Sequence, residues 1–362
     1  MTEPFHFFVL NNAFVNSRES AQLVLGQIPD HPSTVTVIIP TYRRCSLLKA
    51  AIDSVLSQEG FNDFSIVIID NDNDPNSNTE ALLRSYQSRH ILYYKNKCNL
   101  GQISNWNMGV LLASSEWVIL LHDDDQLLPD YMQSVMTVVN DSPYWDGLFT
   151  VPITRSTAGK SRIALRRSSA LKKCFNRVRL CYKKRKSGLV SELSPRDYYY
   201  DCGYTAPIAP IYRRQCLLDM GGFAPEAYPI SDWVLHVNFC RRFKLGVLAR
   251  TCCVRGVGAN ESLKTESKLG FLRQGKLFRE AMRSEFGFFR GDWWIQSALW
   301  YHAIMFYSLA PDELSVCALD KKYNKRRYRL LYQLLVYAYS FFKPYCLQTE
   351  LEDEISSKDA PA

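Results

Sequence analysis

Three neighbouring carboxylates, Asp123, Asp124 and Asp125, follow an apolar run, WVILL, at residues 117–121. Like charges at adjacent positions repel one another, and burial of an unpaired carboxylate costs free energy. One interpretation is a solvated turn in which Asp125 or a neighbour caps the next helix. The other is a cation site, in which a divalent metal ion offsets the repulsion between the carboxylates. The choice depends on what the rest of the chain places nearby.

The region before these carboxylates alternates strand-like and helix-like segments. Apolar, β-branched runs predict buried strands at 34–40, 64–70, 91–96 and 117–121. Apolar residues at helical spacing predict helices at 47–58, 79–89 and 104–114. Ser77 or Asn78 is expected to cap the second helix. This alternation predicts an α/β fold with a doubly wound, mostly parallel sheet.

Polar residues follow three of the expected strands. The sequence PTYRR begins at Pro40, DNDNDPN begins at Asp70, and HDDD begins at His122. Ligands of such sheets bind beyond the carboxyl ends of the strands, so two acidic clusters are expected at one edge. This convergence favours a site for a metal ion and a nucleotide. Neither G-x-G-x-x-G nor G-x-x-x-x-G-K-[ST] occurs in this region, so Mg²⁺ or Mn²⁺ and side chains are expected to hold phosphate.

Length and composition indicate a globular protein with one large domain or two smaller ones. The chain has 362 residues, of which 47% are hydrophobic, and this is enough for a core. Its 11 cysteines include no C-x-x-C pair and no zinc-ligand spacing, which favours reduced thiols in a cytosolic protein. The N-terminus has no basic segment and no long apolar segment, so no signal peptide is expected.

The net charge of +8 comes from one segment of the chain. Residues 155–190 contain 13 Lys or Arg and no Asp or Glu, and the rest of the chain has a net charge of −5. Apolar residues recur among these charges, which is typical of an amphipathic basic helix on an anionic membrane. The alternatives are nucleic-acid binding, a mobile lid for an anionic lipid diphosphate acceptor, and a solvated loop.

Two aromatic stretches near the C-terminus favour the membrane interpretation. Residues 293–310 contain no Asp, Glu, Lys or Arg, and residues 330–342 follow a basic run at 321–329. Both stretches are too short or too polar to span a bilayer, but Trp and Tyr beside basic residues suit its interface. The alternative is a buried helical pair that covers the main domain. Residues 349–362 are expected to be disordered.

Four motifs in sequence resemble the family-2 glycosyltransferases of the GT-A fold. They are VTVIIPTYRR, IVIIDNDNDPN, NKCNLGQISNWNMGV and WVILLHDDDQLLPDYM, and they cover about residues 34–135. The family usually has paired aspartates where this chain has Asp70, Asn71 and Asp72. It commonly has an aspartate first in its metal motif, where this chain has His122. The resemblance implies a nucleotide-sugar donor with Mn²⁺ or Mg²⁺, and a Rossmann-like sheet flanked by helices.

The resemblance also implies roles for the three adjacent aspartates. Asp124 would bind the metal ion directly, and Asp125 is the second candidate ligand. Asp123 would bond the ribose or a water molecule of the nucleotide site. Which of the three carboxylates ligates the ion stays open at this point because His122 changes the register of the motif.

Further residues are implied in nucleotide binding, namely Pro40, Thr41, Tyr42, Arg43, Arg44, Asp70 and Asn105. Asp70 would accept a hydrogen bond from the base or the ribose. Arg43 and Arg44 would approach phosphate, which suits a guanidinium group, or would form a solvated helix start. Asn105 would face the sugar nucleotide or cap the third helix.

A glycosyl transfer also needs a group that deprotonates the acceptor hydroxyl. The family usually has a Glu-Asp pair after a Gly-Gly-Phe segment, and here residues 221–223 are followed by Ser231 and Asp232. The resemblance implies that Asp232 is the general base, and a helix cap is the alternative. His236, one turn later, would share the site or pack in the core. One carboxylate with no second nucleophile favours direct displacement with inversion.

The expected function is transfer of a sugar to a hydroxyl of a surface glycan. The expected acceptor is a glycan or a lipid-linked oligosaccharide. The protein would lie on the cytoplasmic face of an anionic membrane and would not bind nucleic acid. The alternatives are an inactive GT-A-fold binding protein and a nucleotidyltransferase. The expected organisation is an extension at 1–32, a GT-A domain at 33–255, a helical region at 256–348 and the tail at 349–362. Within the GT-A domain, we expect a nucleotide-sugar half at 33–150, the basic insert at 155–190 and an acceptor half at 191–255.

Overall fold

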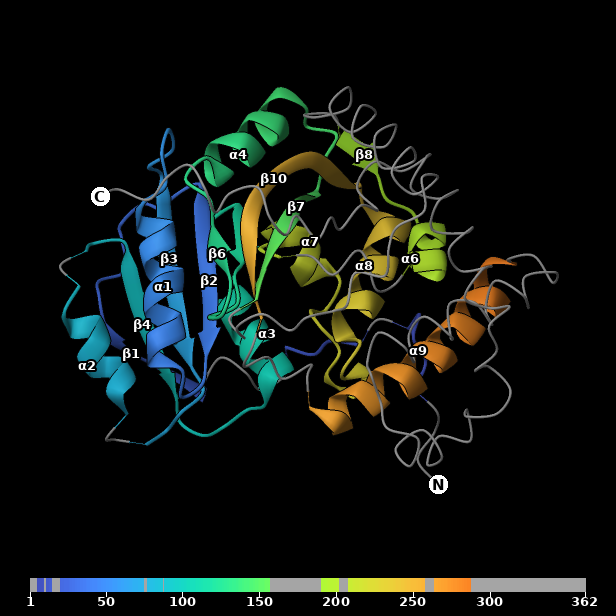
Figure 1. Ribbon diagram of the computed structural model, residues 1–362, viewed down its shortest axis with the longest axis horizontal. Helices are drawn as coiled ribbons and strands as arrows, with labels where there is room; N and C mark the ends of the chain where they lie inside the picture. The colour runs from blue at the N-terminus through green and yellow to red at the C-terminus, as the bar shows by residue number, and fades with distance from the viewer. Residues whose placement is uncertain are drawn as a thin grey trace, which may run out of the picture.

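The computed structural model describes residues 5–9, 11–14, 20–74, 77–86, 88–156, 190–201, 208–257 and 264–287. These ranges form a mixed β-sheet with helices on both of its faces (Figure 1). Most of the basic segment, the two aromatic stretches and the C-terminal tail lie outside the described residues. The predictions made for those segments therefore stay predictions.

The strands lie in the order β1-β4-β3-β2-β5-β9-β7-β10-β6, and β8 pairs with β10. The strand bounds are β1 Ala21–Leu25, β2 Val35–Thr41, β3 Phe64–Asp70, β4 Ile91–Asn96, β5 Trp117–Leu120, β6 Gln126–Leu127, β7 Gly147–Ser156, β8 Val190–Glu192, β9 Ile211–Arg213 and β10 Leu245–Val257. The helix bounds are α1 Cys45–Leu56, α2 Asn78–Arg84, α3 Gln102–Leu112, α4 Tyr131–Asp141, α6 Pro195–Asp201, α7 Arg214–Asp219, η2 Pro225–Ala227, α8 Ser231–Arg242 and α9 Thr265–Phe286.

The four strands β4, β3, β2 and β5 are parallel neighbours. Every residue of β2 and β3 is buried, which agrees with their unbroken apolar sequences because strands covered on both faces do not alternate. The predicted strand–helix alternation and α/β fold class are confirmed, with element ends that differ by up to five residues. Ser77 caps α2, since its side chain accepts a hydrogen bond from the Thr79 amide.

Alternate residues of β2 contact different helix layers. Val37 and Ile39 share a core with α1 and α4 on one face of the sheet. Ile38 points to the other face, where the core also includes α3, α7, α8 and α9. Figure 1 shows α8 and α9 grouped at the end of the molecule remote from α2. Both faces of the sheet are therefore covered by helices, some of them from distant parts of the chain.

Several strands have no signal in the alternating pattern. β1 lies within residues 1–32 and pairs antiparallel with β4. The three-residue β9 lies antiparallel between β5 and β7, and β10 pairs parallel with β7 and antiparallel with β6. The second half of the sheet is thus mixed. No helix among the described residues is both long and apolar enough to cross a membrane.

Candidate active site

The three adjacent aspartates lie just beyond the end of β5 and face the end of β2. Asp123 and Asp125 are buried. The Thr41 hydroxyl, at the last residue of β2, donates to Asp123 Oδ2 at 2.8 Å. Arg44 Nη1, at the N-cap of α1, lies 3.2 Å from Asp123 Oδ1 and 3.5 Å from Asp124 Oδ2. The sheet edge therefore unites the PTYRR and HDDD segments, as the topological rule predicted.

The backbone of β10 covers the other side of these carboxylates. The Gly256 amide donates to Asp125 Oδ1 at 3.1 Å. A Cβ atom on Gly256 would lie 1.9 Å from the Asp124 carbonyl oxygen, so glycine is required for this close approach. Burial raises the pKa of Asp125 to about 7, and the charge of Asp124 adds to the increase. Burial also raises the pKa of Asp123 to about 6, although Arg44 opposes this increase.

His122, Asp124 and Asp125 form a cluster suited to a divalent cation. One ligand atom from each side chain lies within 4.8 Å of the other two. The imidazole of His122 stacks on the indole of Trp106 from α3, with 5.0 Å between the ring centroids, and this contact orients the ring. Carboxylates suit Mg²⁺ and Mn²⁺, and an imidazole adds a nitrogen donor that transition metals accept. The pKa of Asp125 is raised because burial disfavours its negative charge. A bound cation would stabilise that charge, so the residues fit such an ion.

Asp70 lies at the end of β3 with both of its carboxylate oxygens hydrogen-bonded. The Tyr93 hydroxyl donates to Oδ2 at 2.9 Å, and the Asp72 amide donates to Oδ1 at 3.0 Å. Burial raises the pKa of Asp70. Asp72 binds Arg43 through two contacts of 3.2 and 3.3 Å. Arg43 has φ of 57°, a left-handed conformation that is uncommon for a residue with a side chain.

Asn71 connects β3 to the loop before α3. Its amide nitrogen donates to Asn99 Oδ1 at 2.8 Å and lies 3.4 Å from the Gly101 carbonyl oxygen. Its oxygen accepts from Asn96 Nδ2 and from the Leu100 amide. An aspartate at this position would face two acceptor oxygens without a proton to donate. This network explains why the chain carries an amide where the resembling family usually has a carboxylate.

Asn105 belongs to the same buried network. Its Oδ1 accepts from Asn96 Nδ2 at 2.8 Å, and its Nδ2 donates to the Ile69 carbonyl oxygen at 3.2 Å. Helix α3 begins at Gln102 with Gly101 at its N-cap, so the capping interpretation of Asn105 is wrong. The side chain instead fastens α3 beneath the end of β3. Its predicted contact with the sugar nucleotide stays a prediction.

The residues at the end of β2 and in the loop after it differ in their exposure to solvent. Pro40 is the buried penultimate residue of β2, with Ile69 as its register partner on β3. Tyr42 is exposed, and the Arg43 guanidinium lies 5.2 Å from the centre of its ring. A solvent-exposed aromatic ring can stack on a planar ligand.

Asp232 lies on helix α8, which follows the Gly-Gly-Phe segment at residues 221–223. The backbone of Phe223 is clamped by Asn107 of α3, whose amide both accepts from the Phe223 N–H and donates to its carbonyl, each at 2.8 Å. Gly222 has φ of 82°, and a Cβ there would lie 2.7 Å from Asn107 Oδ1. The chain then enters α8 after Ile230, which is the N-cap and makes no side-chain capping bond. Asp232 therefore occupies the first turn of α8 rather than the cap position.

Arg255 is a candidate site residue that the sequence motifs did not indicate. Burial lowers its pKa, and the carboxylates of Asp125, Asp124 and Asp232 oppose that decrease. Burial also raises the pKa of Asp232 to about 6, and the charge of Arg255 acts in the opposite direction. Arg255 thus interacts electrostatically with both the acidic cluster and Asp232. Its position on β10, far along the chain from Asp124 and Asp125, left no local signal.

His236 packs in the core one turn after Asp232. Its Nε2 lies 2.6 Å from the Tyr212 hydroxyl, and its ring contacts Phe149 edge to face. Burial lowers the pKa of His236 to about 3, so the imidazole is neutral near pH 7. Of the two interpretations of His236, the structure supports core packing.

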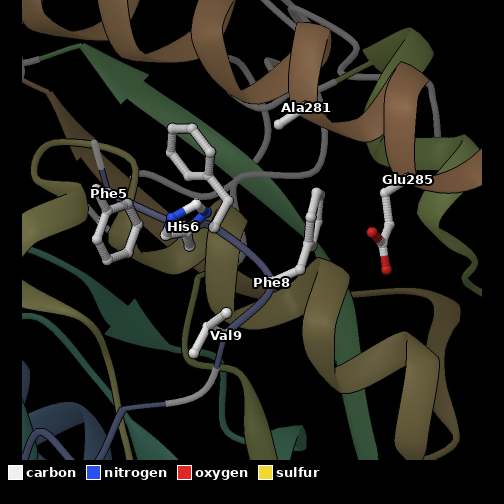
Figure 2. Close-up of a pocket in the computed structure, with 7 residues that line it drawn as sticks. Phe5, His6, Phe8, Val9, Ala281 and Glu285 are labelled. Carbon is white, nitrogen blue, oxygen red and sulfur yellow. The ribbon is translucent and has the colours of Figure 1, made fainter. Parts of the chain in front are cut away.

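An apolar cavity of about 270 Å³ lies between the N-terminal segment and α9. Figure 2 shows the rings of Phe5 and Phe8 gathered below α9, with Glu285 at one side. Glu285 is paired with Arg241 at 2.6 Å. None of the aspartates described above lines this cavity, so it is separate from the candidate active site.

Comparisons with known proteins agree with this architecture. Residues 36–190 match the family described as "Glycosyl transferase family 2". The "GalNAc(5)-diNAcBac-PP-undecaprenol beta-1,3-glucosyltransferase" of Campylobacter jejuni is 33% identical over 110 residues, which cover 30% of this chain and 35% of that protein. The "Abequosyltransferase RfbV" of Salmonella typhimurium is 29% identical over 109 residues, which cover 29% of this chain and 32% of that protein.

A solved structure, S. aureus TarS 1–349 in complex with UDP-GlcNAc, aligns with 86% of this chain and 92% of its own length. The identity is 14% and the TM-score is 0.48, so this likeness carries no argument about function. The match of residues 36–190 to glycosyltransferase family 2 confirms the resemblance. The chain matches about a third of the length of the two curated relatives.

Proposed function

We propose that the protein is a metal-dependent, inverting glycosyltransferase with a nucleotide-diphosphate sugar as donor. One observation carries the proposal: ligand atoms of His122, Asp124 and Asp125 lie within 4.8 Å of one another beyond the end of β5, where Thr41 at the end of β2 donates to Asp123. These residues form a cation-binding cluster at the sheet edge, and Asp232 of α8 is a separate carboxylate. Such an arrangement suits departure of a diphosphate at one side and deprotonation of an acceptor at the other.

His122, Asp124 and Asp125 would hold Mn²⁺ or Mg²⁺, which supplies positive charge for the departing diphosphate. Thr41 and Arg44 keep Asp123 in place through contacts to both of its oxygens. The nucleoside would lie along the loop after β2 and near Asp70. Asp232 would accept the proton of the acceptor hydroxyl, and its pKa of about 6 leaves most of this carboxyl ionised at pH 7.

The acceptor is proposed to be a surface glycan on a lipid carrier. The C. jejuni relative has a name that includes an undecaprenol-linked acceptor, and the basic segment at 155–190 suits an anionic membrane surface. On this proposal the protein acts at the cytoplasmic face of the membrane, in the assembly of a polysaccharide such as lipopolysaccharide.

The test is metal-dependent binding of nucleoside diphosphates by the full-length protein. Thermal unfolding is measured with UDP or GDP, each with and without Mn²⁺. A ligand at about 100 times its Kd stabilises the folded state by about 2.7 kcal/mol, so a clear rise in Tm is expected for the correct pair. Asp124→Ala should lose the metal-dependent rise and retain the Tm of the ligand-free protein to within a few degrees.

Asp141→Ala is the matched control, because Asp141 is an exposed residue at the end of α4. This variant should respond to the ligands as the wild type does. A wild type that ignores every nucleoside diphosphate with Mn²⁺, or an Asp124→Ala variant that binds normally, would contradict the proposed site. Release of a nucleoside diphosphate from the donor, rather than pyrophosphate, identifies glycosyl transfer as the reaction.

A further inference from the structure

Arg44 occupies an unusual position between two of the adjacent carboxylates. A single guanidinium nitrogen, Nη1, lies 3.2 Å from Asp123 Oδ1 and 3.5 Å from Asp124 Oδ2. Asp123 and Asp124 are largely shielded, whereas 28% of the Arg44 side chain is exposed. The cation therefore reaches from the solvent side onto two shielded anions, and it offsets part of the repulsion within the acidic cluster.

The two aspartates differ in how firmly they are bound. Asp123 has a second partner, because Thr41 donates to its Oδ2 at 2.8 Å. Asp124 is also one of the three residues of the candidate cation cluster, and its contact with Arg44 is the longer of the two. A divalent ion held by Asp124 would lie close to the Arg44 guanidinium, and the two positive charges would repel each other. Metal binding and the Arg44–Asp124 contact therefore compete.

We propose that Arg44 is a resident counter-ion, which a divalent metal ion displaces from Asp124 and which then binds the diphosphate of the donor. This inference rests on the proposed function, since it specifies how the same site takes up metal and nucleotide. A guanidinium group suits bidentate contact with phosphate oxygens. The exchange makes the two ligands cooperative, because the metal releases the group that the diphosphate needs, and coupling between two binding sites is reciprocal.

Arg43 provides a matched comparison within the same loop. It carries the same charge, but both of its contacts to carboxylate go to Asp72, at 3.2 and 3.3 Å. It does not contact the three residues of the cation cluster through any described ion pair. Removal of either arginine changes the net charge of the protein by the same amount. A difference between Arg43→Gln and Arg44→Gln therefore isolates the local competition.

The experiment measures the Kd of Mn²⁺ alone, from the electron paramagnetic resonance signal of the free ion in titrations of full-length protein. Arg44→Gln should bind Mn²⁺ about tenfold more tightly than the wild type, which corresponds to about 1.4 kcal/mol. Arg43→Gln should stay within about twofold of the wild type, the expectation for a charge removed away from the cluster. At saturating Mn²⁺, Arg44→Gln should bind UDP or GDP about tenfold more weakly, as expected for loss of a charge-assisted contact.

Circular dichroism establishes that each variant is folded before titration. Arg44→Lys supplies a second test, since an ammonium group keeps the charge but lacks the planar fork. Its Mn²⁺ affinity should lie between those of the wild type and Arg44→Gln. Unchanged or weaker Mn²⁺ binding in Arg44→Gln overturns the exchange while leaving the proposed function intact. A wild type that binds neither Mn²⁺ nor a nucleoside diphosphate overturns both.

Discussion

At the scale of single residues, the environment of Asp232 alters its acid–base chemistry. It lies in the first turn of α8, where burial raises its pKa to about 6 and the charge of Arg255 limits the increase. A carboxylate with this pKa is a stronger base than one in water and is still ionised at pH 7. The adjacent Ser231 hydroxyl is buried without a hydrogen-bond partner among the described residues. The two neighbours therefore offer a catalytic candidate and a control.

Asp232→Asn is expected to reduce turnover by about 10²–10⁴-fold, the usual contribution of general base catalysis. Binding of Mn²⁺ and nucleoside diphosphate should be retained, because Asp232 lies outside the cation cluster. In the wild type, kcat/KM should fall as the pH drops below about 6, since protonation removes the basic form. The measurement is a pH profile of initial transfer rates.

Ser231→Ala is the control for this prediction, because it removes a hydroxyl that has no described partner. It should keep most of the turnover and show the same decrease in kcat/KM at acidic pH. The stability of Asp232→Asn provides a second readout. The folded-state pKa of Asp232 lies above its unfolded value, so the ionised group disfavours folding as the pH rises through about 6. Near-normal turnover in Asp232→Asn would rule out the base assignment.

At the scale of elements, α3 holds both halves of the site in place. Asn105 fastens the helix to β3, and Asn107 clamps the Phe223 backbone that precedes α8. Trp106 stacks on His122 of the cation cluster. Gly109 allows the helix to approach β2, because a Cβ there would lie 2.2 Å from Ile38 Cγ2. The asparagine and glycine pattern of this segment is therefore explained by packing and hydrogen bonding.

Gly109→Ala is expected to lower the free energy of unfolding by about 1–3 kcal/mol, the usual cost of an overpacked core. The added methyl group would force α3 and β2 apart, and both carry site residues. Urea denaturation of the wild type and the variant measures the difference. The same substitution should cost less in an Ile38→Ala background, because the contacting methyl group is then absent. Equal costs in the two backgrounds would contradict the proposed contact.

At the scale of the whole molecule, charge is unevenly distributed along the chain. Residues 155–190 carry 13 basic and no acidic residues, while the remainder has a net charge of −5. The attraction of a basic residue to an anionic membrane is worth roughly 1 kcal/mol near the surface, and salt weakens it. The aromatic stretch that begins at Trp293 would add apolar contacts that do not depend on salt.

The full-length protein is expected to sediment with anionic vesicles at low salt and to be partly released at high salt. Deletion of residues 160–186 should remove the salt-sensitive part of binding. Replacement of Trp293 and Trp294 by alanine should weaken the salt-resistant part. Vesicles of zwitterionic lipid are the control, and should retain only the second part. If the intact protein ignores anionic vesicles even at low salt, the basic segment serves another partner.

The sequence alone determined the parallel half of the sheet and indicated the protein family that its motifs resemble. Buried parallel strands require unbroken apolar runs, and their helices require a 3.6-residue period, so both leave local patterns at 34–121. The carboxyl ends of such strands meet at one edge, so the gathering of the PTYRR and HDDD segments at that edge followed from topology. Short antiparallel strands such as β9 leave no such pattern, because three residues are too few for a periodicity.

The tertiary structure alone decided the partners of individual side chains. Arg44 and Arg43 are adjacent and equal in charge, yet one contacts Asp123 and Asp124 and the other contacts Asp72. The sequence suited Asn105 equally well to a helix cap or to a ligand contact, and the structure excludes the cap and shows a hydrogen bond to the backbone of β3. Arg255 joined the site only because β10 returns beside β7 from a distant part of the chain. Such contacts depend on loop conformation and long-range packing, which local sequence patterns do not encode.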